Sequence, residues 1–134
     1  MTEPTIQNLF DLTDRVALIT GGSGHLGNSL ARALAEAGAS VVIASRSRDR
    51  ARQIAGDLPS PGGAAHFGVQ LDQLDEESLN TGFDEAVESA GKVDILINNG
   101  QKGHPLDLTD AQHLETLRRA VALDQADPDV FPEF

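Results

Sequence analysis

The sequence predicts an α/β fold with a doubly wound parallel sheet, truncated after about four strands. Two observations lead to this prediction. Short apolar runs alternate four times with segments of helical spacing, and no internal repeat accompanies them. A glycine-rich turn joins the first apolar run to the first helical segment. This alternation is typical of βαβ units, in which right-handed crossovers make consecutive strands parallel.

The expected strands are apolar runs that suit burial on both faces of a sheet. They cover residues 16–20, 41–44, 66–71 and 93–97. The expected helices cover residues 26–37, 48–58 and 74–90, with Gly38 ending the first and Gly91 the third, and a fourth runs from Thr109 or Asp110 to about Leu123. The residues expected on the inward faces of these helices are Leu26, Leu30, Leu34, Ala37, Ala51, Ile54, Ala55, Leu58, Leu79, Phe83, Ala86, Val87, Leu114, Leu117 and Val121.

The chain is expected to form one domain with two short extensions. Residues 1–13 form a polar arm, residues 14–123 form the folded domain, and residues 124–134 form an acidic tail. The tail holds two prolines and four acids, so we expect it to be disordered or loosely docked. The core is expected to be aliphatic, because the 134 residues include five phenylalanines but neither tryptophan nor tyrosine.

Charge and composition exclude several classes of partner and site. The formal net charge of −11 repels nucleic acid and anionic lipid, so we expect neither as a partner. The chain has no cysteine, and its histidines lack the spacing of metal ligands, so we expect no metal site. The polar N-terminus is not a signal peptide, and no apolar run is long enough to span a bilayer, so a cytoplasmic location is expected.

The glycine-rich turn has the pattern of a dinucleotide-binding loop. It contains G-x-G-x-x-G at Gly22, Gly24 and Gly27, after a predicted strand and at the start of a predicted helix. Glycine permits a tight turn and lets a pyrophosphate approach the backbone, and the helix N-terminus favours the anion. The alternative interpretation is an ordinary strand-to-helix turn. The loop as a whole reads Thr20, Gly21, Gly22, Ser23, Gly24, His25, Leu26 and Gly27.

The end of the second strand indicates which dinucleotide is preferred. An acid is expected about 20 residues beyond the glycines, where it would hold a ribose 2′-hydroxyl. Ser45 stands there instead, and Arg46 follows. A guanidinium pairs with a 2′-phosphate, so the sequence favours NADP, with NAD as the alternative. The competing interpretation is that Arg46, Arg48 and Arg50 form a solvated helix start.

Three motifs in order, covering about residues 14–124, resemble those of the short-chain dehydrogenase/reductase family. The glycine loop resembles its T-G-x-x-x-G-x-G signature, although the middle glycine of that pattern would fall at His25. The spacing T-G-x-x-G-x-x-G of some members matches throughout. The stretch 71–78 resembles D-V-T-D, and the stretch 94–100 resembles D-x-L-x-N-N-A-G, with Gln101 in place of the final glycine.

The resemblance implies a Rossmann-like fold and roles for particular residues. Asp72, followed by Gln73, would bond the adenine amino group, although Asp72 or Asp75 could instead cap the next helix. Asn98, followed by Asn99, would support the sheet. Gly100 would let the backbone approach the nicotinamide ribose. His25 is expected to be a solvent-side loop residue, with a phosphate contact as the alternative. The expected cofactor-binding residues are Gly21, Gly22, Ser23, Gly24, His25, Leu26, Gly27, Ser45, Arg46, Asp72, Gln73, Asn98, Asn99 and Gly100.

The residues that perform the family's chemistry have no match in this chain. The family uses a serine and a Y-x-x-x-K motif in its second half to move a proton while a hydride passes between nicotinamide and an alcohol or carbonyl. This chain has no tyrosine, and its lysines, Lys92 and Lys102, come too early to match. Asp124 stands where the family has an asparagine. We therefore expect a cofactor-binding half, inactive alone, and hypothesise a truncated or frameshifted reading frame.

Two other functions remain open at this stage. The chain could be a non-catalytic module, a nucleotide sensor or a partner for an intact homologue, that self-associates or pairs through an exposed apolar fourth strand. It could also be an atypical reductase that uses His104 and Asp107, although nothing in the sequence positions those two groups.

Overall fold

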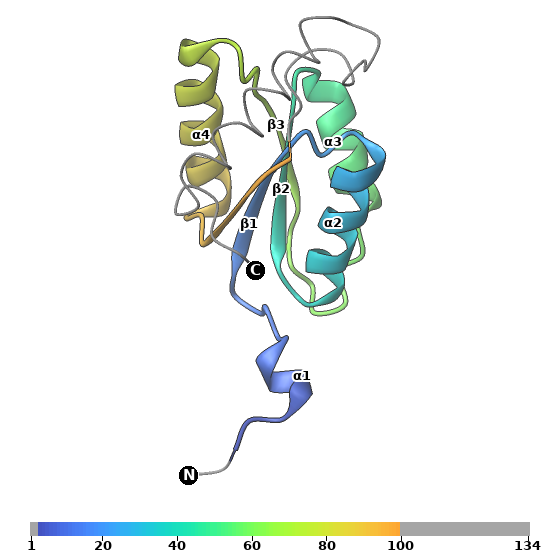
Figure 1. Ribbon diagram of the computed structural model, residues 1–134. Helices are drawn as coiled ribbons and strands as arrows, with labels where there is room; N and C mark the ends of the chain where they lie inside the picture. Colours follow the sequence, from blue (N-terminus) through green and yellow to red (C-terminus); the bar gives the residue numbers. More distant parts are fainter. Residues whose placement is uncertain (1–2, 100–134) are drawn as a thin grey trace, which may run out of the picture. The chain divides into compact units, whose positions relative to one another are not determined.

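The computed structural model describes residues 3–99, which contain a parallel four-stranded sheet with helices on both faces (Figure 1). The strands are β1 (Val16–Thr20), β2 (Ser40–Ser45), β3 (Phe67–Gln70) and β4 (Ile95–Asn98), in the spatial order β3-β2-β1-β4. The predicted α/β class and parallel sheet are confirmed. β1 has the predicted bounds, and the ends of the other three strands differ from the prediction by one or two residues. The helix expected from about residue 109 and the tail from residue 124 lie outside the described residues.

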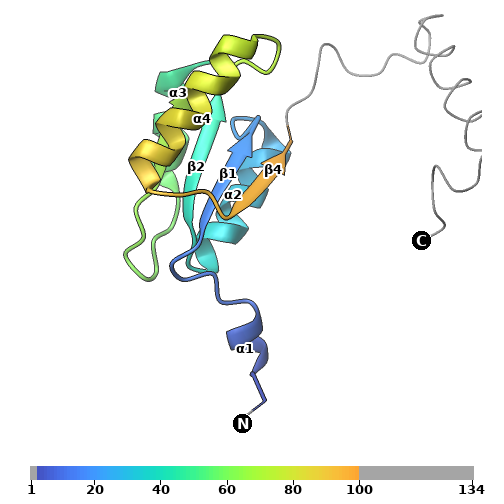
Figure 2. The same ribbon diagram turned by 90° about the vertical axis from the view of Figure 1, so that its left-hand side faces the viewer.

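The helices divide between the two faces of the sheet. Helices α2 (His25–Glu36) and α3 (Arg48–Asp57) pack on one face, and α4 (Glu76–Ala90) packs on the other (Figures 1 and 2). The chain winds outward from β1 to β3 with helices on one face, and then returns across the sheet to β4 by way of α4. The expected polar arm contains one short helix, α1 (Ile6–Leu9).

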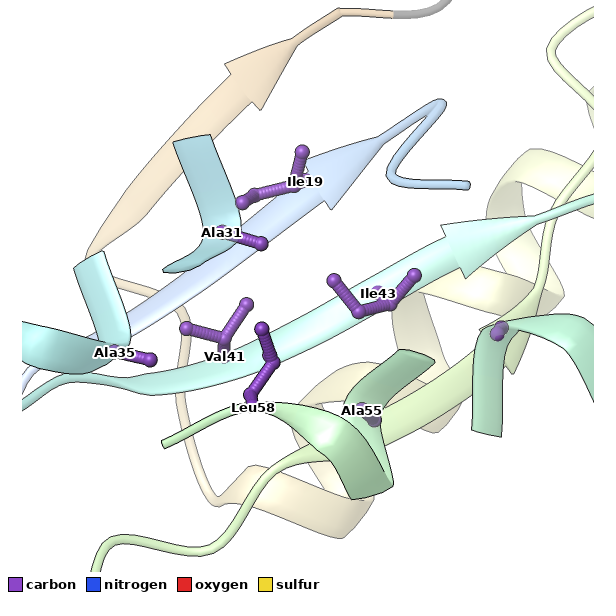
Figure 3. Packing of buried hydrophobic residues seen from close by; sticks show 8 residues of the cluster. Ile19, Ala31, Ala35, Val41, Ile43, Ala55 and Leu58 are labelled. Atoms are coloured by element: carbon purple, nitrogen blue, oxygen red, sulfur yellow. The ribbon is translucent and has the colours of Figure 1, made fainter. Parts of the chain in front are cut away.

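Residues of β1 and β2 alternate between two hydrophobic cores, because successive side chains of a strand point to opposite faces. Ile19 and Ile43 contribute to the core beneath α2 and α3, whereas Leu18 and Val42 contribute to the core beneath α4. Figure 3 shows the first core, where aliphatic strand residues face small helix residues. The buried residues of the first core are Ile19, Ala31, Ala35, Val41, Ile43, Ala51, Ala55 and Leu58.

The ends of the helices follow from their capping residues. Ser47 caps α3, and its side chain accepts from the backbone N–H of Arg50. Asp75 caps α4 by accepting from the N–H groups of Glu77 and Ser78, so of the two predicted candidates Asp75 rather than Asp72 performs this role. Gly91 ends α4 in the left-handed conformation with φ of +88°, as its position in the sequence predicts.

The predicted inward faces are wrong at three positions. Leu26 is 65% exposed, because α2 contacts the sheet through the small residues Ala31 and Ala35, which lie on a different side of the helix. Leu79 and Phe83 are 36% and 44% exposed, because α4 turns Gly82 and Ala86 toward the sheet. Small residues let a helix approach a sheet closely, and the larger neighbours are then displaced to the sides of the contact.

Helix α3 approaches β3 so closely that Gly68 has no room for a side chain. A Cβ atom there would lie 2.5 Å from the carbonyl carbon of Ala51 and would also collide with the backbone nitrogen of Arg52. Both obstacles are backbone atoms, so they give way only if the helix moves as a whole.

We predict that Gly68→Ala lowers the free energy of unfolding by about 1–3 kcal/mol, as overpacking substitutions do. Gly62→Ala is the matched control, because no atom lies within 4 Å of a Cβ at that position. The control is expected to leave stability unchanged or to raise it by up to about 1 kcal/mol. Urea unfolding of both variants measures the difference, and equal midpoints would contradict the close packing of α3 on β3.

Candidate functional site

The sequence-predicted site residues gather at the carboxyl ends of the strands. The glycine loop follows β1, Ser45 ends β2, Asp72 comes shortly after β3, and Asn99 follows β4. All four strands are parallel, so their carboxyl ends lie along one edge of the sheet. In open α/β sheets this edge is where ligands bind, next to the point at which the chain reverses its direction of winding. Gly100 lies outside the described residues.

The glycine loop is a tight turn whose three motif glycines differ in what surrounds them. A Cβ on Gly22 would lie 2.9 Å from Cγ2 of Ile43, and a Cβ on Gly27 would lie 2.5 Å from the carbonyl oxygen of Gly21. A Cβ on Gly24 would meet only the Gly21 oxygen, at the ordinary distance of 3.7 Å. Internal packing therefore requires glycine at positions 22 and 27 but not at position 24.

The loop places the start of α2 at the edge of the sheet where the carboxyl ends of the strands lie, which is called the carboxyl edge below. Gly21 adopts a left-handed φ of +63°, and its carbonyl accepts from the backbone N–H of Gly24 at 3.3 Å. Gly24 is the N-cap of α2 and provides no side-chain cap for the first helical turn. The N–H groups of that turn have no partner within a helix, so they favour an anion.

The two residues after Gly24 belong to α2 rather than to the loop. His25 is exposed, as expected for a solvent-side residue, and it is the first residue of this helix, which begins one position earlier than predicted. Leu26 is exposed beside it. Both side chains lie on the outer surface of the first helical turn, next to the N–H groups described above.

Asn99 joins the end of β4 to the glycine loop. Its backbone N–H donates to Oγ1 of Thr20 at 3.1 Å, and its Nδ2 donates to the carbonyl oxygen of Gly21 at 3.2 Å. A Cβ on Gly27 would lie 2.7 Å from this Nδ2 atom. Sequence reasoning associated support of the sheet with Asn98. Asn98 of β4 pairs in register with Thr20 of β1. The side chain that bonds the loop is that of Asn99.

The start of β4 is anchored to β1 by Asp94. Its backbone N–H donates to the carbonyl oxygen of Val16, and its Oδ2 accepts from the N–H of Val16, both at 2.9 Å. Lys92 Nζ lies 3.1 Å from the same carboxylate, and Arg15 lies 3.9 Å from it. The hydrogen bond from Val16, followed by that from Lys92, holds the pKa of Asp94 below its usual value.

Ser45 links the end of β2 to the glycine loop. Its side chain is buried, its Oγ donates to Oγ of Ser23 at 3.4 Å, and it accepts from the backbone N–H of Ser47 at 3.3 Å. Arg46 is exposed, and its carbonyl oxygen accepts from Nε2 of Gln70 at 3.2 Å. Ser45, at the position expected to recognise the ribose, therefore directs its hydroxyl toward the glycine loop. Arg46 is its neighbour in the sequence.

The competing interpretation was that the arginines after β2 form a solvated helix start. This does not hold for all of them, because two make contacts with other elements. Arg48 forms a two-point ion pair with Glu85 of α4, in which Nη2 donates to Oε2 at 2.9 Å and Nη1 donates to Oε1. This pairing raises the pKa of Arg48 and lowers that of Glu85. Arg50 donates through Nη2 to the carbonyl oxygen of Ser23 at 3.2 Å.

Sequence reasoning missed the contact between Arg50 and the loop. The signal that could have revealed it is the sheet order, because β1 and β2 are neighbours and end at the same edge. The first turn of the helix after β2 must then lie near the loop after β1.

Asp72 and Gln73 lie after β3 in a turn that Asp72 itself stabilises. Its Oδ1 accepts from the N–H of Leu74 at 3.0 Å, and its backbone N–H donates to Oγ of Ser78 at 2.9 Å. Asp72 is half-buried and Gln73 is exposed. This geometry fixes the backbone of the turn at the same edge of the sheet as the glycine loop.

His66 has a structural role within the described residues. Its Nδ1 accepts from the N–H of Val41 at 3.1 Å, and its Nε2 lies 2.8 Å from the carbonyl oxygen of Pro59, so the ring joins the loop before β3 to β2. Over residues 3–99 no three histidine or acidic side chains gather in a way that could hold a metal ion. His104, Asp107 and His113 lie outside that range.

No helix in the part of the chain that the structure describes is long and apolar enough to cross a membrane.

Comparison with known proteins matches the chain to one family. The family model for short chain dehydrogenases covers residues 15–123. The 3-oxoacyl-[acyl-carrier-protein] reductase of Aquifex aeolicus (strain VF5) is 36% identical over 88 residues, which is 66% of this chain and 36% of that protein.

Two solved structures have similar folds and carry bound nucleotides. A 3-ketoacyl-(acyl-carrier-protein) reductase from Brucella melitensis complexed with NADH has a TM-score of 0.64 and 33% identity, over 79% of this chain and 43% of that one. A gluconate 5-dehydrogenase from Burkholderia cenocepacia J2315, in complex with NADP and tartrate, has a TM-score of 0.64 and 34% identity, over 86% of this chain and 46% of that one. The chain therefore spans less than half the length of each of these proteins.

We predict that Asp94→Asn lowers stability at pH 7 and that the difference from the parent protein shrinks in acid. The lowered pKa of Asp94 means that its carboxylate stabilises the folded state above the ordinary aspartate pKa of about 3.9. This contribution is lost as the pH falls through the lowered value, where both proteins carry an uncharged side chain. Urea midpoints at pH 7 and in acid measure the effect. Asp84→Asn, at an exposed position of α4, is the control, and a pH-independent difference for Asp94→Asn would contradict the prediction.

Proposed function

Because the chain belongs to the short chain dehydrogenase family, we propose that its carboxyl edge binds a nicotinamide dinucleotide, with NADP preferred over NAD. We propose further that it acts as the cofactor-binding half of an oxidoreductase that transfers hydride between nicotinamide and an alcohol or carbonyl. The observation that carries the proposal is the contrast among the glycines, since Gly24 is the motif glycine that internal packing does not require.

The residues of the carboxyl edge fit such a cofactor. Gly24 leaves open space over the first turn of α2, whose uncapped N–H groups would hold the pyrophosphate. Gly22 and Gly27 allow the close packing of the turn, because a Cβ at either position would collide with neighbouring atoms. Asp72, in the turn after β3, would accept from the adenine amino group. Asn99 keeps the end of β4 beside the loop, where the nicotinamide ribose would lie.

The preference for NADP rests on the end of β2. Ser45 stands where a carboxylate would hold a 2′-hydroxyl and repel a 2′-phosphate, and Arg46 supplies a cation next to it. The solved relatives include one NADH complex and one NADP complex, which supports the cofactor class and leaves the choice to these local residues.

Bound cofactor would supply the hydride donor or acceptor, and this chain's own residues would bind and orient it. The 134 residues contain no tyrosine, so no phenol is present to exchange the substrate proton. We therefore propose that the chain alone binds the dinucleotide without transferring hydride.

We predict that the chain binds NADPH with micromolar affinity and NADH more weakly. We predict further that Gly24→Ala weakens NADPH binding by about tenfold and lowers the free energy of unfolding by no more than about 1 kcal/mol, since alanine is a poorer N-cap than glycine. The added methyl group projects into the space proposed for the pyrophosphate, and steric overlap of this kind costs about 1–3 kcal/mol. Calorimetric titration with each nucleotide, together with urea unfolding, provides the measurement.

Gly27→Ala is the matched comparison, because its methyl group collides with the chain's own backbone. It is expected to lower the free energy of unfolding itself. No binding of either nucleotide to the folded parent chain, or unchanged affinity in Gly24→Ala, would contradict the proposal.

A second candidate function is subunit interaction without catalysis. Over the described residues β4 is an edge strand, and Leu96 is 53% exposed in it. Leu96, Leu79 and Phe83 line a groove of about 390 Å³ between α4 and the sheet. An edge strand with an exposed leucine, next to a groove that also exposes Leu79 and Phe83, favours pairing with a second copy of the chain or with a homologue.

We predict that the chain self-associates and that Leu96→Lys shifts it toward the monomer, because a charge in the groove opposes burial. Sedimentation velocity at several concentrations measures the change. Leu74→Lys is the control, since Leu74 is 67% exposed in the turn before α4. A monomeric parent chain, or equal effects of the two variants, would exclude the groove as an interface.

A further inference from the structure

Arg50 lies beside the glycine loop although it follows β2 by five residues. Its Nη2 donates to the carbonyl oxygen of Ser23 at 3.2 Å, which joins the first turn of α3 to the loop after β1. The guanidinium is thus held at the carboxyl edge of the sheet, between two segments that are proposed to contact the dinucleotide.

The start of α3 sets the position of this side chain. The Oγ of Ser47 accepts from the backbone N–H of Arg50 at 3.3 Å, so the capping contact fixes the third residue of the helix. Ser45 reaches the same loop from the end of β2, through its 3.4 Å contact with Oγ of Ser23. The end of β2, the start of α3 and the glycine loop therefore meet at Ser23.

The positive charge at this junction is not paired with a carboxylate, which is also true of Arg52 on the far side of α3 from the glycine loop. The chain carries a net charge of −11, yet neither Arg46 nor Arg50 forms an ion pair with any acid among residues 3–99. Arg48, between them in the sequence, is paired with Glu85. The guanidinium groups of Arg46 and Arg50 are therefore available to bind an anionic ligand at this edge of the sheet.

We propose that Arg50 is a second specificity-determining residue, which together with Arg46 selects the 2′-phosphate of NADP. This inference rests on the proposed function. A guanidinium carries five N–H donors, so Arg50 holds the Ser23 carbonyl with one and keeps others for phosphate oxygens. It therefore recognises the phosphate and fixes the adjacent loop in the same contact.

The test compares two nucleotides that differ only by the 2′-phosphate. Calorimetry measures the affinity of the full chain for adenosine 2′,5′-bisphosphate and for adenosine 5′-monophosphate, in the parent protein and in Arg50→Gln, Arg50→Lys and Arg52→Gln. Arg52 is the matched control, since it lies on the same helix, has the same charge and lines a groove with His66 and Glu85 instead of the glycine loop. Circular dichroism verifies that each variant is folded.

We expect Arg50→Gln to weaken binding of the bisphosphate by about tenfold to a hundredfold, as the loss of a hydrogen bond to a charged group does. Binding of the monophosphate should change by less than about threefold, and Arg50→Lys should restore part of the loss because it keeps the charge without the planar fork. Arg52→Gln should keep the parent's ratio of affinities.

An unchanged ratio in Arg50→Gln would overturn the inference, and so would an equal loss in Arg52→Gln, which would reveal a general charge effect. Either result leaves the proposed function intact if the parent chain binds both nucleotides. A parent chain that binds neither nucleotide would overturn the proposed function and this inference together.

Discussion

A Cβ atom on Gly27 would lie 2.5 Å from the carbonyl oxygen of Gly21 and 2.7 Å from Nδ2 of Asn99. The absence of a side chain at Gly27 therefore lets α2 pack directly against the turn that follows β1. Asn99, at the end of β4, contacts the same turn by donating to the Gly21 oxygen. The Gly21 oxygen and the Asn99 side chain occupy the space that a side chain at position 27 would need. The glycine loop, α2, β1 and β4 therefore hold one another in place. A Cβ on Gly24, by contrast, would meet only the Gly21 oxygen, at 3.7 Å.

Small residues extend this close packing across the rest of the sheet. Ala31 and Ala35 of α2 and Gly68 of β3 place helix backbone near strand backbone, so the core consists of aliphatic strand residues against alanine. In β4 the pattern changes, because Leu96 lines a groove between α4 and the sheet and remains half exposed among the described residues.

Several basic residues within residues 3–99 join secondary-structure elements through ion pairs. Lys92 and Arg15 support Asp94 where β4 begins, and Arg48 joins α3 to α4 through Glu85. Arg46, Arg50 and Arg52 have no such carboxylate partner within the described range, and of these Arg46 and Arg50 lie at the edge where the strands end. Unpaired cations placed next to a helix start and a glycine turn are available to an anionic ligand, which is why the proposed recognition of NADP centres on them.

The sequence by itself determined the type, order and approximate bounds of the elements, because apolar runs, capping residues and turn glycines are local signals. It also identified the glycine loop, Ser45 and Arg46 from spacing alone. The tertiary structure decided which face of each helix is buried, so Leu26, Leu79 and Phe83 are exposed where periodicity predicted burial. It also decided that Asn99 bonds the loop and that Arg50 reaches Ser23. These contacts join residues 78 and 27 positions apart, and no local pattern records which distant segments the sheet order makes neighbours.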